Sequence, residues 1–262
     1  MTTPRQGQGW AIVTGASSGI GREFAKALAA RGHSLLVVAR RRDRLDELAR
    51  DLASTGVQVE PFVADLESRE GPAAVANKAL ELGQLALLIN CAGFGNFGYF
   101  SEQPLDKILG AVRLNIESVV ELTHRLLPVM KRQKSGGVIN VGSSLGLQPV
   151  PYFSVYAATK AFVISFSEGL AEELSGTGVQ VVVVCPGPVK TEFADHSSSG
   201  SVTSRIPNLV PEDVVRAALA AYDGKRVVTI PGFTNKLLAL CPRLLPRSAM
   251  RGTMAMMMKP AA

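Results

Sequence analysis

The chain has 262 residues, a hydrophobic fraction of 47% and a formal net charge of +6, and these values limit the classes of protein to which it can belong. The length and apolar content suit a single α/β domain, 1–262, with one large core. Three widely spaced cysteines and the lack of a secretory leader indicate a reducing, cytoplasmic compartment. The three histidines form no cluster of metal-binding type, so we expect no catalytic metal.

The positive charge is concentrated at the carboxyl end and does not indicate a nucleic-acid partner. The last 27 residues hold five positive charges and no acid, whereas the first 235 are nearly balanced. A locally basic tail and contacts to an anionic cofactor explain this distribution more simply than nucleic-acid binding. The five are Lys236, Arg243, Arg247, Arg251 and Lys259.

The first predicted strand, 10–13, runs into a glycine-rich turn, and an amphipathic helix is predicted over 22–31. Strand, glycine turn and helix are the context of a dinucleotide-binding loop, in which backbone N–H groups and the positive helix end face a pyrophosphate. Here the spacing is Gly-x-x-x-Gly-x-Gly rather than the commoner Gly-x-Gly-x-x-Gly. The expected contacts are Gly15, Ser17, Ser18, Gly19, Ile20 and Gly21.

The second predicted strand, 33–39, ends in arginines rather than in an acid. The tip of this strand meets the adenosine ribose in nucleotide folds, where arginine suits a 2′-phosphate and a carboxylate suits a free hydroxyl. We therefore favour NADP over NAD, with Arg40 as the main candidate and Arg41 beside it. Alternatively, these arginines only begin the exposed helix predicted over 43–53.

A third strand is predicted over 57–63, a helix over 73–82 and a fourth strand over 85–90. Asp65 can cap the following helix or bind an adenine amine, with Leu66 beside it. Small residues after the fourth strand let a flat ring lie against the backbone, so we include Asn90, Ala92 and Gly93 in the cofactor site. The alternation predicts a doubly wound parallel sheet of about seven strands with helices on both faces.

A long helix is predicted from Pro104 to Lys134, and Asn115 interrupts its apolar face. A buried Asn is either a satisfied core amide or part of a water network. The fifth strand, 137–142, ends in Ser143 and Ser144, which alone would be ordinary turn residues.

Tyr156 and Lys160 lie four residues apart at the start of a helix predicted over 155–174, so they share one face. A neighbouring ammonium favours the phenolate and should lower the tyrosine pKa, which suits proton transfer near neutral pH. A solvated surface pair is the plainer interpretation of the same spacing.

A strand over 179–185 leads into a rigid loop at Pro186 and Gly187, whose backbone groups could meet the planar amide of a cofactor. Val189 and Thr191 follow and are expected to touch the cofactor. Residues 194–208, within the interval 190–210, are rich in Ser and Gly and predict a substrate lid. A helix over 211–221 and a strand over 226–230 complete the domain before the tail, 233–262.

Together these motifs resemble the short-chain dehydrogenase/reductase family over about the first four-fifths of the chain. The segment 14–21 resembles its cofactor loop, and 90–93 resembles its Asn-Asn-Ala-Gly motif with Cys91 in place of the second Asn. Four residues match the catalytic tetrad in order and spacing: Asn115, Ser143, Tyr156 and Lys160.

The resemblance implies hydride transfer from NADPH to a carbonyl carbon while Tyr156 protonates the oxygen. Lys160 would lower the tyrosine pKa and hold the nicotinamide ribose, Ser143 would polarise the carbonyl, and Asn115 would support a water leading to Lys160. The family also implies a homodimer or homotetramer, often built from the helices that carry Asn115 and Tyr156.

The expected substrate pocket is aromatic and has no ionic clamp, which favours a bulky, uncharged ketone or aldehyde. Its predicted residues are Phe94, Phe97, Leu145, Tyr152 and Phe193. A 3-oxoacyl-carrier-protein reductase is the alternative within the class. A non-catalytic NADP-binding sensor or structural relative is less favoured, because Tyr156 and Lys160 are both retained.

The tail has leucines and a methionine-rich end but no apolar run of the ~20 residues needed to span a membrane. It could cap the substrate cleft, form a subunit contact or lie on an anionic membrane surface. We favour packing on its own subunit or on a partner.

Overall fold

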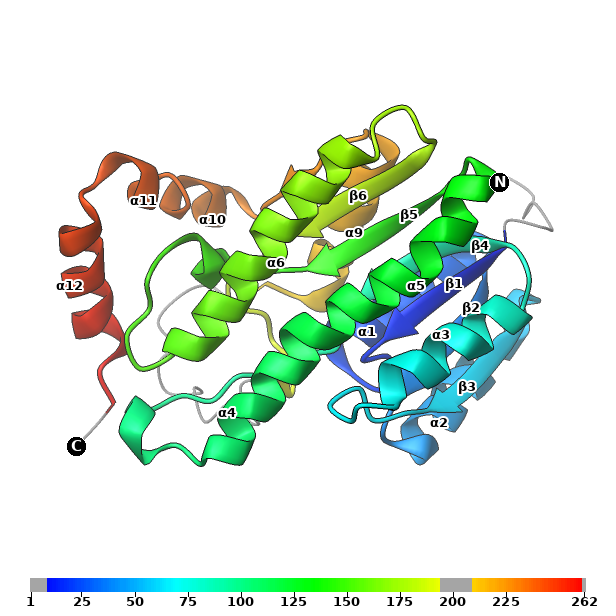
Figure 1. Ribbon diagram of the computed structural model, residues 1–262, viewed down its shortest axis with the longest axis horizontal. Coiled ribbons are helices and arrows are strands. Elements are labelled where there is room, and N and C mark those ends of the chain that lie inside the picture. Colours follow the sequence, from blue (N-terminus) through cyan, green and yellow to red (C-terminus); the bar gives the residue numbers. More distant parts are fainter. Residues whose placement is uncertain (1–8, 194–208, 261–262) are drawn as a thin grey trace.

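The computed structural model describes residues 9–193 and 209–260, which fold around one seven-stranded parallel sheet (Figure 1). The strand order is β3-β2-β1-β4-β5-β6-β7, so the order reverses between β1 and β4. The central strands are nearly continuous apolar runs, as expected for strands covered on both faces. The strands are β1 (Trp10–Thr14), β2 (Ser34–Ala39), β3 (Val59–Val63), β4 (Leu85–Asn90), β5 (Gly136–Val141), β6 (Val179–Val184) and β7 (Val228–Thr229).

Helices cover both faces of the sheet, which confirms the doubly wound architecture (Figure 1). The apolar sides of α1 (Gly19–Ala30), α2 (Arg42–Leu52) and α9 (Pro211–Asp223) are buried in one core. Those of α3 (Gly71–Glu81), α5 (Ser118–Gln133) and α6 (Ser154–Glu173) are buried in the other. Most of the helix and strand boundaries predicted from the sequence lie within a few residues of the boundaries in the structure.

The predicted long helix from Pro104 to Lys134 forms, but it contains a local irregularity. A π-turn over Arg113–Glu117 joins α4 (Leu105–Val112) to α5, and Asn115 lies inside it, fully buried. π-Helical turns are rare, occur mostly as single turns inside α-helices, and are frequently found at functional sites. The polar residue that interrupts the apolar face therefore coincides with a change in backbone geometry.

The predicted lid, 194–208, lies outside the described residues. The segments on either side of it are hydrogen-bonded to each other: the Lys190 N–H donates to the Leu209 carbonyl (2.9 Å), and the Leu209 N–H donates to the Pro188 carbonyl (2.8 Å). These bonds hold Leu209 beside Pro188 and Lys190.

The tail forms three helices, α10 (Phe233–Leu238), α11 (Cys241–Leu244) and α12 (Arg247–Met258), which make an arc at the left of Figure 1. One side of α12 packs against the start of α6, where three buried methionines meet Phe153 and Tyr156: Met250, Met254 and Met258. The tail thus packs on its own subunit. Among the described helices, none combines the length and apolarity needed to cross a bilayer.

Candidate active site

A cleft of about 910 Å³ lies at the carboxyl ends of the strands. Ligands of open α/β sheets bind at this edge, where the strand order reverses. Most residues predicted to contact a cofactor line the cleft: Gly15, Ser17, Ser18, Gly19, Ile20, Gly21, Arg40, Arg41, Asp65, Leu66, Ala92, Gly93, Pro186, Gly187, Val189 and Thr191.

The glycine-rich turn is fixed against the end of β4. Thr14 Oγ1 accepts hydrogen bonds from the N–H groups of Cys91 (2.9 Å) and Ala92 (3.1 Å). A Cβ added at Gly21 would lie 2.3 Å from the Gly15 carbonyl oxygen, so a side chain cannot be placed there. The first residues of α1, whose N–H groups have no partner within the helix, line the cleft and supply the donors that a phosphate needs.

The two candidate arginines after β2 have different surroundings. The Arg41 guanidinium donates to Ser17 Oγ in the glycine turn (3.1 Å) and to the Glu192 carboxylate (2.9 Å). Arg40 instead pairs with Glu67 (2.8 Å), and its side chain is 65% exposed, against 39% for Arg41. The side chain directed toward the glycine turn is therefore that of Arg41, not that of Arg40, the residue favoured from sequence.

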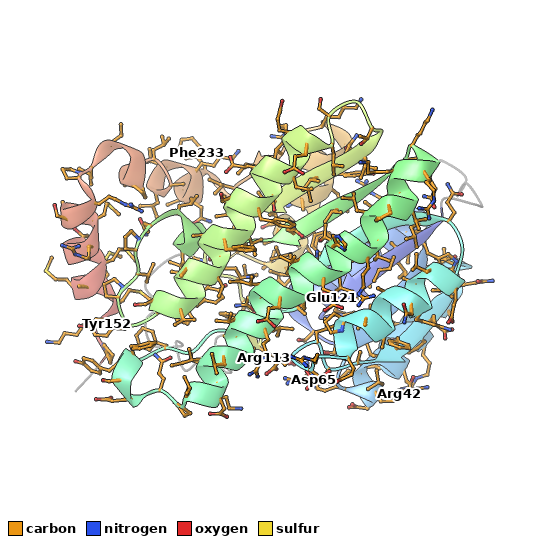
Figure 2. The ribbon with its side chains drawn as sticks, in the orientation of Figure 1. Arg42, Asp65, Arg113, Glu121, Tyr152 and Phe233 are labelled. Carbon is orange, nitrogen blue, oxygen red and sulfur yellow. The ribbon has the colours of Figure 1, made fainter. Side chains whose placement is uncertain are left out.

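Asp65 stands at the carboxyl edge of the sheet (Figure 2). Its carboxylate accepts a hydrogen bond from the N–H of Glu67 (3.0 Å). Because α3 begins at Gly71, Asp65 is not the residue that caps this helix. It orders the turn after β3 and lines the cleft.

Asn90 is placed differently from its predicted role. Its amide donates to Asn140 Oδ1 (2.8 Å) and Thr123 Oγ1 (3.3 Å), and its side chain is buried between β4, β5 and α5. Asn140 in turn donates to Ser167 Oγ on α6 (2.9 Å). The Asn90 side chain therefore ties the sheet to its helices and does not line the cleft.

Tyr156 and Lys160 are both buried at the base of the cleft, so the solvated surface pair is excluded. The Lys160 ammonium lies 5.7 Å from the centroid of the Tyr156 ring and donates to the Val141 carbonyl at the end of β5 (2.8 Å). Ser143 is within hydrogen-bonding reach of the phenol, and its Oγ accepts from the Leu145 N–H (3.2 Å). The structure thus brings three of the predicted tetrad together.

Burial is the main cause of the pKa shifts of Tyr156, Lys160 and Cys91. Loss of hydration raises the pKa of Tyr156 above its ordinary value of 10.0, and the hydrogen bond with Ser143 offsets this only in part. Burial also lowers the pKa of Lys160 from 10.5 to about 8, and raises that of the neighbouring Cys91 thiol to about 12. The net shift of the Tyr156 pKa is therefore upward, because desolvation by burial is its largest cause, and the lowering expected from Lys160 stays a prediction.

The fourth residue of the tetrad, Asn115, lies behind the cleft. Its amide donates to the Phe94 carbonyl (2.8 Å) and to Thr159 Oγ1 (3.0 Å), and its oxygen accepts from the Phe94 N–H (3.2 Å). Thr159 Oγ1 also donates to the Tyr156 carbonyl (2.8 Å). Asn115 therefore connects the loop after β4 to the helix that carries Tyr156 and Lys160.

The substrate side of the cleft agrees with the prediction in part. Phe94, Leu145 and Phe193 line it, and the Phe193 ring lies 5.3 Å from that of Tyr156. Phe97 and Tyr152 do not line it. Their rings pack edge-on against Phe153 (5.9 Å) and Tyr99 (5.2 Å), respectively, and so form a layer behind the cleft.

Several lining residues were missed from sequence. Phe153 stacks on Tyr156 (4.6 Å between centroids), and Gln148 donates to Met254 Sδ (3.3 Å). The methionines could have been found, because spacings of four residues place them on one helical face. The additional lining residues include Gln148, Phe153, Met250, Met254, Met257 and Met258.

Asn235 of α10 also escaped prediction. It is buried, its amide donates to the Pro231 carbonyl (3.0 Å), and a Cβ at Gly187 would lie 2.4 Å from its oxygen. The tail therefore supports the Pro186-Gly187 loop as well as covering the cleft.

Comparison with known proteins agrees with this geometry. The family model for the short chain dehydrogenases matches residues 9–201. The chain is 35% identical over 215 residues to a very-long-chain 3-oxoacyl-CoA reductase of Anas platyrhynchos, covering 80% of this chain and 67% of that protein.

Two solved structures cover nearly the whole chain. A short-chain dehydrogenase from Sphingobium yanoikuyae in complex with NADPH has a TM-score of 0.80 at 34% identity, covering 97% of this chain and 98% of the other. A bulky-bulky ketone specific alcohol dehydrogenase from Comamonas testosteroni has a TM-score of 0.77 at 33% identity, covering 97% of this chain and 96% of the other. The chain belongs to the short-chain dehydrogenase/reductase family and is an oxidoreductase of that family.

The close approach of the loop after β4 to Tyr156 can be tested by replacing Gly95 with Ala. The new methyl would lie 2.6 Å from Tyr156 Cδ2 and 2.8 Å from Phe153 Cε2, so the phenol must shift. Since misplacement by about 1 Å can cost on the order of 100-fold in rate, we expect kcat/KM for carbonyl reduction to fall by about that factor.

Gly169→Ala is the matched control, since nothing lies within contact distance of that position on α6. We expect unchanged turnover and a free energy of unfolding that is equal or up to ~1 kcal/mol higher. Wild-type kcat/KM in Gly95→Ala would contradict the described packing of Tyr156.

Proposed function

We propose that the protein reduces bulky, apolar ketones or aldehydes to alcohols with NADPH, and oxidises the alcohols in reverse. The observation that carries this proposal is the buried group of Ser143, Tyr156 and Lys160 at the base of a cleft whose substrate side is aromatic and methionine-rich. The Comamonas testosteroni relative is described as specific for bulky-bulky ketones.

The described residues fit an NADPH molecule. The N-terminal turn of α1 would hold the pyrophosphate, Arg41 and Arg40 the 2′-phosphate, and Lys160 the nicotinamide ribose. A lysine ammonium has three donors, and Lys160 uses one of them on Val141. Bound NADPH would supply the hydride.

The protein's own part in the reaction is proton transfer and charge stabilisation. The raised pKa of Tyr156 keeps the phenol protonated, so it can donate to the carbonyl oxygen. Ser143 would donate a second hydrogen bond to that oxygen. Lys160, charged below about pH 8, would stabilise the phenolate that forms. Asn115 would act as a positioning residue through Phe94 and Thr159, and a proton-carrying water beside it stays a prediction.

A 3-oxoacyl thioester is the second candidate substrate. The Anas platyrhynchos relative is named as a very-long-chain 3-oxoacyl-CoA reductase, and exposed basic residues of α12 lie beside the cleft. An apolar cleft accommodates an acyl chain as well as a bulky ketone. The two candidate substrates therefore differ in the part of the molecule that would extend outside the cleft.

The proposed function is tested by following NADPH oxidation with three substrates: an aryl alkyl ketone, a 3-oxoacyl-CoA and a small keto acid. We expect the aryl ketone to be preferred, because the substrate side of the cleft is lined mainly by aromatic and methionine side chains. Tyr156→Phe should lower kcat at least about 100-fold, the usual contribution of a general acid, while NADPH still binds. Preference for the keto acid, or wild-type turnover in Tyr156→Phe, would refute the proposal.

The cofactor assignment is tested by Arg41→Gln, with Arg42→Gln as the matched control. Arg42 is exposed, pairs with Asp46 and does not line the cleft. We expect Arg41→Gln to weaken NADPH binding at least about tenfold, the worth of a charge-assisted hydrogen bond, and to leave NADH binding nearly unchanged. If the two variants bound NADPH with equal affinity, Arg41 would not be the residue that binds the 2′-phosphate.

A further inference from the structure

The tail presents an apolar and basic surface, which we call the tail surface and define by the exposed residues of α10, α11 and α12. Phe233, Leu244 and Met256 are 84%, 80% and 79% exposed, values unusual for side chains of this size. Other exposed members are Leu237, Leu238, Leu240, Leu245 and Met257.

The same surface carries positive charge without compensation. Lys236, Arg247, Arg251 and Lys259 are exposed, and none of the four pairs with an acid among the described residues. The segment from Phe233 to the end of the chain contains no Asp or Glu. An apolar surface with only positive charges suits a partner that is negatively charged outside and apolar beneath.

The tail surface is continuous with the cleft. Leu238, Leu245 and Met257 are each about half exposed, and each also lines the cleft. The opposite side of α12 is buried on Phe153 and Tyr156, so packing of the tail on its own subunit leaves this outer surface uncovered. Figure 2 shows Phe233 on α10, at the outer side of the arc that the tail helices form.

We propose that the tail surface docks on an anionic lipid bilayer, which places the mouth of the cleft at the lipid surface. Basic side chains would meet the head groups while the exposed leucines, methionines and Phe233 enter the acyl boundary. Self-association through two tails would bring like charges together without any acid, and an acidic soluble partner would leave the apolar residues unexplained. Docking does not depend on the proposed reaction, although it would give an apolar substrate a direct route into the cleft.

The test is co-sedimentation of the full chain with vesicles of phosphatidylcholine containing phosphatidylglycerol, and with vesicles of phosphatidylcholine alone. We expect binding to the anionic vesicles that weakens as salt is raised. Replacing both Arg247 and Arg251 by Gln should lower the partition coefficient about thirtyfold, because each positive charge near an anionic surface contributes roughly fivefold to binding. Phe233→Ser with Leu244→Ser should lower it at least about tenfold.

Matched controls lie far from the tail. Lys131→Gln with Arg132→Gln removes two exposed charges at the end of α5, and Val63→Ser removes an exposed apolar side chain from β3. Neither should change vesicle binding, and circular dichroism verifies that each variant is folded.

Three outcomes would overturn the proposal. The first is no binding to either kind of vesicle, and the second is binding that the arginine variant leaves unchanged. The third is a fall in oligomeric mass by light scattering in the tail variants, without vesicle binding, which would assign the tail surface to a second copy of the chain. Because none of these readouts measures turnover, a failure here is distinguishable from a failure of the proposed reaction.

Discussion

The hydrogen bond from the Lys160 ammonium to the Val141 carbonyl holds a buried cation at the carboxyl end of β5, and the site is arranged around it. A buried charge is costly unless its donors are satisfied. Among the described residues this ammonium has one acceptor, so it is ready to take further acceptors from a ligand in the cleft. The same burial keeps Tyr156 protonated and brings the pKa of Lys160 close to neutral.

The surroundings of this pair come from segments far apart in the sequence. The loop after β4 passes so close to Tyr156 that only glycine fits at position 95. Asn115, inside the π-turn between α4 and α5, fixes that loop through both backbone groups of Phe94. From the other side, α12 covers Tyr156 and Phe153 with methionines. The position of the Tyr156 phenol therefore depends on the loop after β4, on the π-turn between α4 and α5, and on the tail helix α12.

Much of the fold could be predicted from the sequence, because its elements follow local rules. Apolar runs of strand length alternate with helical periodicity, and the glycine turn between β1 and α1 is short-range chemistry. Most of the cofactor residues follow from the same turn-and-strand-end logic. Asn90 could not be placed this way, because its amide nitrogen donates to Asn140 and Thr123, which are distant in sequence.

Quantities that depend on burial were the least predictable. The spacing of Tyr156 and Lys160 indicates that they meet, but not that burial raises the pKa of the phenol. Likewise, the choice between Arg40 and Arg41 depends on Glu67 and Glu192, which only the folded chain brings near. The methionine face of α12 was visible in the sequence, whereas its position against Tyr156 was not.

Burial brings the pKa of Lys160 to about 8, and we expect the site to need the charge of this ammonium. The most direct test is the pH dependence of kcat/KM for NADPH at saturating ketone, because this parameter reports ionisations of the free enzyme. A lowered lysine pKa means that the charge is present below about pH 8 and lost above it, so kcat/KM should be level at lower pH and fall as the pH rises through about 8. A profile that stays level up to the ordinary lysine pKa of 10.5 would contradict the claim.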